Sequence, residues 1–275
     1  MASSGVRQRP PRDGSGHPPL KPPLKWAGGK RWLVSKLLPI WSAHQKCRLV
    51  EPFCGGLAVA LGLSPSRALL NDVNPHPVNF YRYLQTGLKI RIPMRNERDL
   101  YYRHRNDFNR LVSGRGLNTR KAAELFYYLN RTGYNGLCRF NRKGEFNVPF
   151  GQYKQINYTR DFNQYSAVLS KWRFENRDFE TLPLRRGDFI YADPPYDVPF
   201  TQYAKEGFGW SEQERLATWL REHDGPVVLS NQATHRVVKL YRRLGFRLSF
   251  VSAPRMISCT GDRSPAREVI AVHGL

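Results

Sequence analysis

A predicted buried strand in this sequence ends abruptly at two prolines. Residues 187–192 (GDFIYA) predict a turn and then the strand, and Asp193-Pro194-Pro195-Tyr196 comes directly after it. Proline lacks a backbone N–H and has a fixed φ, so two in succession cannot continue a strand ladder. In an open α/β sheet, ligands gather at the carboxyl ends of the strands. The tetrapeptide is therefore either a proline-rich turn that caps a strand or a rigid receptor for a flat amine, and these residues alone do not decide between the two.

A second pattern, over residues 48–61 (RLVEPFCGGLAVAL), predicts a strand, a glycine turn and a helix. Nucleotide-binding folds begin with such a βα unit, although the glycines here do not form the dinucleotide pattern GxGxxG. Residues 68–72 predict the next strand, which ends in Asp72 about 20 residues after the first, where an acid accepts hydrogen bonds from ribose hydroxyls. Asp72 could instead cap the following helix, but its spacing from the glycine turn favours the ribose role.

Periodicity and turn residues predict the remaining elements. Helices are expected at 31–40, 76–90, most of 97–130, and 211–223 with Ser211 as its N-cap. Strands are expected at 172–182, at 227–231, and as a terminal antiparallel hairpin between 246 and 272. The sequence thus predicts an α/β fold with a mostly parallel, Rossmann-like sheet and a mainly helical insertion that carries a β-hairpin.

The positive charge of the chain is large and unevenly placed. The 275 residues carry a net charge of +22, and the pI is near 10.3. Residues 81–171 hold 18 Lys and Arg against six acids, so this third of the chain contributes +12. A solvated surface needs less charge than this, so the excess indicates a polyanionic partner, with nucleic acid ahead of an anionic membrane.

Within this basic segment, residues 130–151 combine Asn, Arg and Tyr with several glycines. The run Asn-Arg-Lys-Gly at 141–144 suits a hairpin turn. Asn and Arg are the side chains that read adenine and guanine edges, and Tyr can stack on bases or wedge between them. The segment therefore predicts DNA recognition in preference to a purely structural basic hairpin.

The N-terminal part of the chain divides into a tail and a loop. Residues 1–21 are rich in Pro, Gly, Ser and Arg and predict a disordered basic tail. Residues 22–30 (PPLKWAGGK) predict a stiff lead into a small-residue loop. Lys30 there could meet a carboxylate or phosphate and Trp26 offers a flat face; the alternative is a Trp that merely packs before a helix.

Other features narrow the class of protein. The four cysteines are scattered without a CxxC pair, so neither a metal site nor a disulfide framework is expected, and a reducing cytoplasm is the default. The sequence has no apolar stretch of the length that a signal peptide or membrane span needs.

Six stretches in this order resemble the DNA adenine-N6 methyltransferases whose target recognition lies between the cofactor loop and the DPPY tetrapeptide, the GATC-methylating type. The resemblance covers about residues 22–275. It rests on LKWAGGK (24–30), EPFCGG (51–56), LNDVNP (70–75), LNRTGYNGLCRFNRKGEFNVPFG (129–151), ADPPY (192–196) and LSN (229–231).

The resemblance implies S-adenosylmethionine as cofactor and double-stranded DNA as partner of a bacterial or phage enzyme, expected to be a cytoplasmic monomer without metal or membrane. Its cofactor site would comprise Trp26 and Lys30 at the methionine end, Phe53 and Gly55 in the loop, Asp72 at the ribose, Asp178 at the adenine, and Asp193. The residues facing DNA would be Lys25, Tyr134, Asn135, Leu137, Arg139 and Pro149. The catalytic domain would combine 22–80 with 172–275, and 81–171 would be the target-recognition domain.

The implied chemistry centres on the tetrapeptide. The Asp193 carboxylate and the Pro194 carbonyl would accept hydrogen bonds from the adenine amine, and Tyr196 would stack on the flipped base. The open alternatives are another planar amine (RNA adenine, cytosine N4 or a protein glutamine) and a non-catalytic DNA-binding protein. The acid at position 193 and the intact DPPY argue against them.

Two positions depart from the family pattern. Leu57 stands at the last glycine of the cofactor loop FxGxG, which bears on the backbone of that loop. Gln152 stands where GATC enzymes often carry an Arg after PFG, so Lys154 or the N-terminal tail would supply backbone affinity instead.

Overall fold

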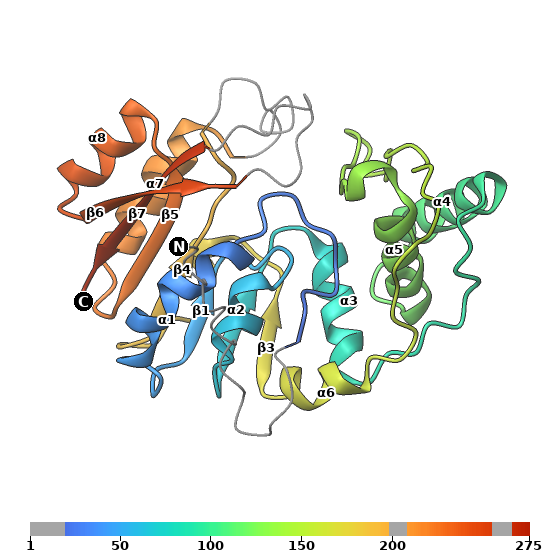
Figure 1. Ribbon diagram of the computed structural model, residues 1–275, viewed down its shortest axis with the longest axis horizontal. Coiled ribbons are helices and arrows are strands. Elements are labelled where there is room, and N and C mark those ends of the chain that lie inside the picture. The colour runs from blue at the N-terminus through green and yellow to red at the C-terminus, as the bar shows by residue number, and fades with distance from the viewer. Residues whose placement is uncertain (1–19, 198–207, 255–265) are drawn as a thin grey trace, which may run out of the picture.

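The computed structural model describes residues 20–197, 208–254 and 266–275, which build one mixed sheet with helices on both faces (Figure 1). In these residues the sheet has seven strands in the order β3-β2-β1-β4-β5-β7-β6. Neighbouring strands are parallel, except that β7 runs antiparallel to both β5 and β6. The strands are β1 (Leu49–Glu51), β2 (Ala68–Asn71), β3 (Trp172–Glu175), β4 (Phe189–Ala192), β5 (Val227–Gln232), β6 (Arg247–Ala253) and β7 (Ala266–His273). The predicted mostly parallel sheet with a terminal antiparallel pair is confirmed.

The central strands are short apolar runs because helices cover both of their faces. Every residue of β1, β2 and β4 is buried. The direction of the strand order reverses between β1 and β4, and in such sheets the crevice at the reversal is where ligands bind. Asp193 follows β4 at this point, so the topology places the tetrapeptide beside the end of β1.

Alternating side chains divide the core in two. One cluster joins Leu49 and Tyr191 to α1 (Val34–Ser42), α2 (Ala58–Leu63) and α3 (Pro75–Gln85). The other joins Val50 and Ile190 to α7 (Trp210–Arg221) and α8 (His235–Arg243).

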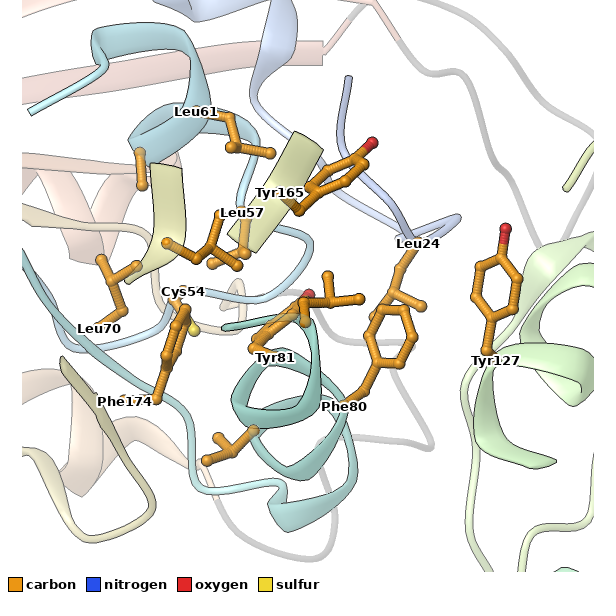
Figure 2. Close-up of a cluster of buried hydrophobic side chains, with 14 of the residues drawn as sticks. Leu24, Cys54, Leu57, Leu61, Leu70, Phe80, Tyr81, Tyr127, Tyr165 and Phe174 are labelled. Carbon is orange, nitrogen blue, oxygen red and sulfur yellow. The ribbon is translucent and has the colours of Figure 1, made fainter. Parts of the chain in front are cut away.

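Two further helices lie beyond α3, on the side away from β5, and a third lies at the foot of α3 and β3 (Figure 1). They are α4 (Arg98–Ser113), α5 (Arg120–Thr132) and α6 (Asn163–Leu169). The first cluster continues into them: Phe80 of α3 stacks on Tyr127 of α5 with ring centroids 5.3 Å apart (Figure 2). This packing fixes the insertion against the sheet domain through shared apolar contacts.

The basic hairpin is present but carries little regular strand. Phe140 and Phe146 form one antiparallel bridge and Gly133 and Phe150 another. The predicted turn closes at Gly144, whose N–H donates to the Asn141 carbonyl at 2.9 Å. Single turns of 3-10 helix complete the fold, at η1 (Arg31–Leu33), η2 (Tyr134–Gly136) and η3 (Phe179–Thr181).

Several predicted boundaries are wrong. Helix α7 starts at Trp210 with Gly209 as N-cap and no side-chain cap, so Ser211 is not the cap. The strand expected to run to 182 ends at Glu175, because Asp178 turns the chain by accepting from the Glu180 N–H. The helical region 97–130 divides, since α4 ends at Ser113 with Gly114 as its C-cap, and Thr119 caps a new helix. The helix expected over 76–90 ends at Gln85.

Some predictions concern residues that the structure does not describe. Positions 1–19 of the expected tail, and most of the loops at 197–208 and near 260, lie outside the described residues. Lys21 is described, and its carbonyl accepts a hydrogen bond from the Tyr165 hydroxyl at 2.7 Å.

Candidate active site

Polar side chains follow one another across the carboxyl edge of the sheet, on the face that α1 covers. Strand alternation puts Glu51 on the same face as Leu49, and Asp193 on the same face as Tyr191. Since Ala192 pairs with Leu229, Asp193 lies next to Ser230 of β5. Glu268, near the start of the antiparallel strand β7, pairs with Gln232 of β5 and therefore lies at the same edge of the sheet.

Lys30 lies over this row of polar groups. Its Nζ is 3.1 Å from Asp193 Oδ2 and 3.9 Å from Glu268 Oε1, and it donates to the Gly28 carbonyl at 2.8 Å. The ammonium is also 4.6 Å from the centre of the Tyr196 ring. Only 5% of the Lys30 side chain is exposed. The small-residue loop therefore delivers a buried cation to the tetrapeptide, and the structure brings Lys30, Asp193 and Tyr196 together.

Two opposing influences act on Asp193. Burial raises the pKa of its carboxyl group, whereas the Lys30 charge and the Ser230 hydrogen bond lower it. Ser230 Oγ donates to Asp193 Oδ1 at 2.7 Å. Each carboxylate oxygen thus has a fixed partner, Ser230 on one side and Lys30 on the other.

The backbone of the tetrapeptide is also held. The Pro195 carbonyl accepts from Gln213 Nε2 at 2.7 Å, and the Gln213 Oε1 in turn accepts from Asn231 Nδ2 at 2.9 Å. Both amide side chains are buried. The stiffness expected from two prolines is therefore reinforced by α7 and β5.

The remaining acids of the site are buried as well. Burial, and then the Asp193 charge, raises the pKa of Glu51 well above its usual range. Burial raises the pKa of Glu268, and Lys30 opposes that change. Burial and the Asp193 charge raise the pKa of the Tyr196 hydroxyl. Within the described residues, Glu51 Oε1 is buried without a hydrogen-bond partner.

The glycine loop lies under Trp26. A Cβ atom built on Gly55 would be 2.6 Å from Trp26 Nε1, and one on Gly56 would be 2.7 Å from Trp26 Cβ. Gly55 also has a φ of +43°, which favours glycine. The two glycines are needed because the indole ring crosses the loop at contact distance.

Asp72 joins this loop to the start of α3. Its Oδ2 accepts from the Gly55 N–H at 3.0 Å and its Oδ1 from the Asn74 N–H at 2.9 Å. Burial raises the pKa of Asp72 to about 6, and these two donors oppose the shift. The capping role considered for Asp72 is wrong, because Asn74 is the N-cap of α3.

Phe53 and Asp178 are brought to one side of the loop. The Phe53 ring packs on Phe179, with centroids 5.8 Å apart. Both Asp178 oxygens accept from Arg215, at 2.9 and 2.7 Å, and this pairing lowers the pKa of Asp178. The Asp178 carboxylate thus already has a strong partner in this structure.

Leu57 shows how the loop accommodates the loss of a family glycine. Its backbone is left-handed, with φ 62° and ψ 22°, as a glycine there would allow. Its side chain is fully buried beside Cys54 and Leu70 (Figure 2). The substitution therefore leaves a glycine-like backbone in place and adds an apolar side chain to the core.

A clamp joins the loop at 24–30 to α5. The Lys25 N–H donates to Asn130 Oδ1 at 2.9 Å, and Asn130 Nδ2 donates to the Lys25 carbonyl at 2.8 Å. Lys25 Nζ donates to the Arg131 carbonyl and lies 4.0 Å from the centre of the Tyr153 ring. Burial lowers the pKa of Lys25. This residue pairing ties the loop bearing Trp26 and Lys30 to the basic segment.

The other residues expected to face DNA lie on the basic hairpin. Tyr134, Asn135 and Pro149 are exposed and Leu137 is partly exposed. Arg139 is braced across the hairpin, because its Nε donates to Asn147 Oδ1 at 2.7 Å and its Nη2 to the Asn147 carbonyl at 3.2 Å. Gln152 and Lys154 are exposed.

Sequence reasoning missed four residues that complete these contacts: Glu51, Asn130, Ser230 and Glu268. Ser230 and Glu51 lay inside recognised stretches without an assigned role. The signal for Glu268 in the sequence was a single acidic residue within the apolar run of β7.

Across the described parts of the chain, no helix is long and apolar enough to span a membrane and no group of His, Cys, Asp and Glu could hold a metal ion.

Comparison with known proteins gives a consistent result. Residues 26–257 match the family described as D12 class N6 adenine-specific DNA methyltransferase. The chain is 35% identical over 265 residues to the Retron Ec67 DNA adenine methylase of Escherichia coli, covering 91% of this chain and 90% of that protein. It is 36% identical over 275 residues to a DNA adenine methylase of Vibrio cholerae, covering 90% and 94%. It is 33% identical over 268 residues to the DNA N-6-adenine-methyltransferase of Escherichia phage P1, covering 90% of this chain and 35% of that longer protein. The chain belongs to the D12 class of N6 adenine-specific DNA methyltransferases.

Proposed function

We propose that this DNA adenine methyltransferase moves a methyl group from S-adenosylmethionine to N6 of an adenine that is flipped out of double-stranded DNA, within the sequence GATC. The observation that supports this most is the partly buried Asp193 at the reversal point of the sheet, with Ser230 on one oxygen and Lys30 on the other.

The residues present fit S-adenosylmethionine. Gly55 and Gly56 let Trp26 lie directly against the loop, so the indole would form one wall of a cofactor site beside it. Lys30 would meet the carboxylate of the cofactor, and Asp72 would accept from its ribose hydroxyls. The buried Glu268, 3.9 Å from Lys30 Nζ, adds an acceptor to this side of the site. When bound, the cofactor supplies a methyl group on a sulfonium, which makes that methyl group electrophilic.

The protein's task is to make the adenine amine a better nucleophile, because its lone pair is delocalised into the ring. Asp193 and the carbonyl of the buried Pro194 would accept hydrogen bonds from its two N–H groups and draw the nitrogen toward tetrahedral geometry. Once methylated, the nitrogen would lose one proton, which Asp193 would take up and pass to solvent. Tyr196 would offer the base an aromatic surface. Much of the rate then comes from holding the two reactants in line, and the rigid Pro194-Pro195 backbone suits that task.

The segment 81–171 would act as the target-recognition domain. Its net charge of +12 suits phosphate contacts, and its exposed Tyr134 and Asn135 suit contacts with bases. The resemblance of the hairpin to those of GATC-methylating enzymes favours GATC as the target.

The test is transfer of tritiated methyl groups from the cofactor to DNA, RNA and protein, followed by mapping of modified adenines on a plasmid. We expect methylation of adenine in double-stranded DNA, at GATC. Asp193→Ala should lower the rate at least 10³-fold, on the order of what a group contacting the reacting atoms contributes, and leave DNA binding within about twofold. The exposed Asp224, at the opposite edge of the sheet, provides the control Asp224→Asn, which should stay fully active. Near-normal turnover of Asp193→Ala would rule out this mechanism.

A further inference from the structure

The hydroxyl groups behind Asp193 form a buried chain. Ser230 Oγ is 2.7 Å from Asp193 Oδ1, and Tyr191 Oη is 2.9 Å from Ser230 Oγ. Ser230 is fully buried and Tyr191 is 2% exposed. Tyr191 lies in β4 and Asp193 directly follows that strand, two positions on, so both point to the face on which Ser230 also lies.

The direction of this chain follows from its protons. An ionised carboxylate only accepts hydrogen bonds, and a hydroxyl group has one proton to donate. Lys30 beside Oδ2 favours the ionised form of Asp193. The Ser230 proton must then point to Asp193, so the proton between Ser230 and Tyr191 must come from Tyr191.

We propose that Ser230 is a positioning residue for the catalytic carboxylate, and that Tyr191 orients Ser230 by donating to it. This inference rests on the proposed role of Asp193. On this proposal, the pairing of β4 with β5 orients the Asp193 carboxylate through Oδ1, and Lys30 holds Oδ2. The free lone pairs of the carboxylate are thereby directed to one place, where the adenine amine would lie.

Other groups face the carboxylate and bear on its pH behaviour. These are Lys30, Glu51, Glu268 and Tyr196, besides Tyr191 itself. Tyr196 also hydrogen-bonds to the carboxylate. Ser230 donates to Oδ1 and Lys30 lies beside Oδ2, so removal of the Ser230 hydroxyl acts on the Oδ1 side.

The experiment measures the single-turnover rate of methyl transfer against pH for Ser230→Ala, Tyr191→Phe and the double variant. Loss of Ser230 should lower the rate at neutral pH by about 10- to 100-fold, the range for a hydrogen bond to a charged group, with KM for DNA unchanged within twofold. The acid limb of the pH profile should move to higher pH, because a donor to the ionised form has been removed. Tyr191→Phe should give a smaller loss, and the double variant no more than Ser230→Ala.

Matched controls separate positioning from folding. Ser249→Ala removes a strand hydroxyl of β6, and Tyr165→Phe a tyrosine hydroxyl that donates to Lys21; both should be neutral for the rate. Ser230→Thr keeps the hydroxyl and should restore most of the rate. If Ser230→Ala fails to fold, Tyr191→Phe, which loses one oxygen atom, still decides the matter through the rate and the acid limb.

Full activity of Ser230→Ala, an unmoved acid limb, or losses that add in the double variant would overturn the inference. If those results come with an inactive Asp193→Ala, only the positioning role fails. If Asp193→Ala is active, the proposed mechanism itself fails.

Discussion

Leu57, in the glycine loop, has a left-handed backbone conformation that lowers the free energy of unfolding. For a residue with a Cβ atom, this conformation costs roughly 1–2 kcal/mol. Full burial of a leucine side chain contributes about 1.5–3 kcal/mol. The packing of Leu57 therefore offsets the strain of its backbone, which is why the loop can do without its third glycine.

This balance predicts an unusual order of stability for variants at Leu57. Leu57→Ala loses packing and keeps the strain, so it should cost about 2–5 kcal/mol of unfolding free energy. Leu57→Gly loses slightly more surface but relieves the strain, so it should be at least as stable as Leu57→Ala. The control is Leu61 in helix α2, where the Gly variant should be about 1 kcal/mol less stable than the Ala variant. Urea unfolding measures all four, and the same order at both positions would contradict the strain.

At the scale of elements, the basic hairpin holds Arg139 rigidly by bonding it to the opposite arm at Asn147. An arginine already braced through Nε loses less entropy when it meets a guanine. The hairpin needs this help because only isolated bridges, and no continuous ladder, join its arms.

Arg139→Ala should therefore relax the choice at one base pair by about 1–3 kcal/mol of discrimination. Rates on duplexes with each base of the target replaced in turn would show it. Lys143→Ala, in the exposed turn of the same hairpin, is the matched control and should weaken binding equally for all sequences. An unchanged order of preferred duplexes in Arg139→Ala would exclude Arg139 as a reader.

The elements around the site could be predicted because each is an apolar run with a clear end: the prolines after β4, the glycines after β1 and the acid after β2. The contacts that could not be predicted depend on the register in which the strands pair. Nothing local to β7 says that Glu268 pairs opposite Gln232 and so reaches Lys30. The Ser211 cap was wrong because a good capping residue is only an option, and here the helix starts one residue earlier at Trp210.

For the molecule as a whole, two buried groups give stability opposite dependences on pH. Asp72 has a pKa of about 6, above its ordinary 3.8, so the folded state binds this proton more tightly. Its contribution to stability is present at low pH and is lost as the pH rises from about 4 to about 6. His76, buried against Phe140, has a pKa lowered from 6.5 to about 4 by burial, so the folded state binds its proton less tightly. The contribution of His76 to stability is lost as the pH falls from 6.5 to about 4.

Single variants should separate these two effects. The unfolding free energy of the wild type minus that of Asp72→Asn should fall as the pH rises from 4 to 6, by at most ~1.4 kcal/mol per pH unit. The same difference taken against His76→Phe should rise from pH 4 to 6.5. Urea titrations at several pH values measure both differences. Parallel trends for the two variants would refute the assignment.

The clamp between Lys25 and Asn130 has a thermodynamic consequence. Trp26 covers the glycine loop. The residue before it, Lys25, is hydrogen-bonded to Asn130 of α5 through both its N–H and its carbonyl. A shift of α5 would therefore be transmitted to the residue that covers the glycine loop. If DNA and the cofactor bind as proposed, linkage would make such an influence reciprocal: the factor by which DNA changes the affinity for the cofactor would be the factor by which the cofactor changes the affinity for DNA. Substitution of the single Asn130 side chain would then weaken both effects together.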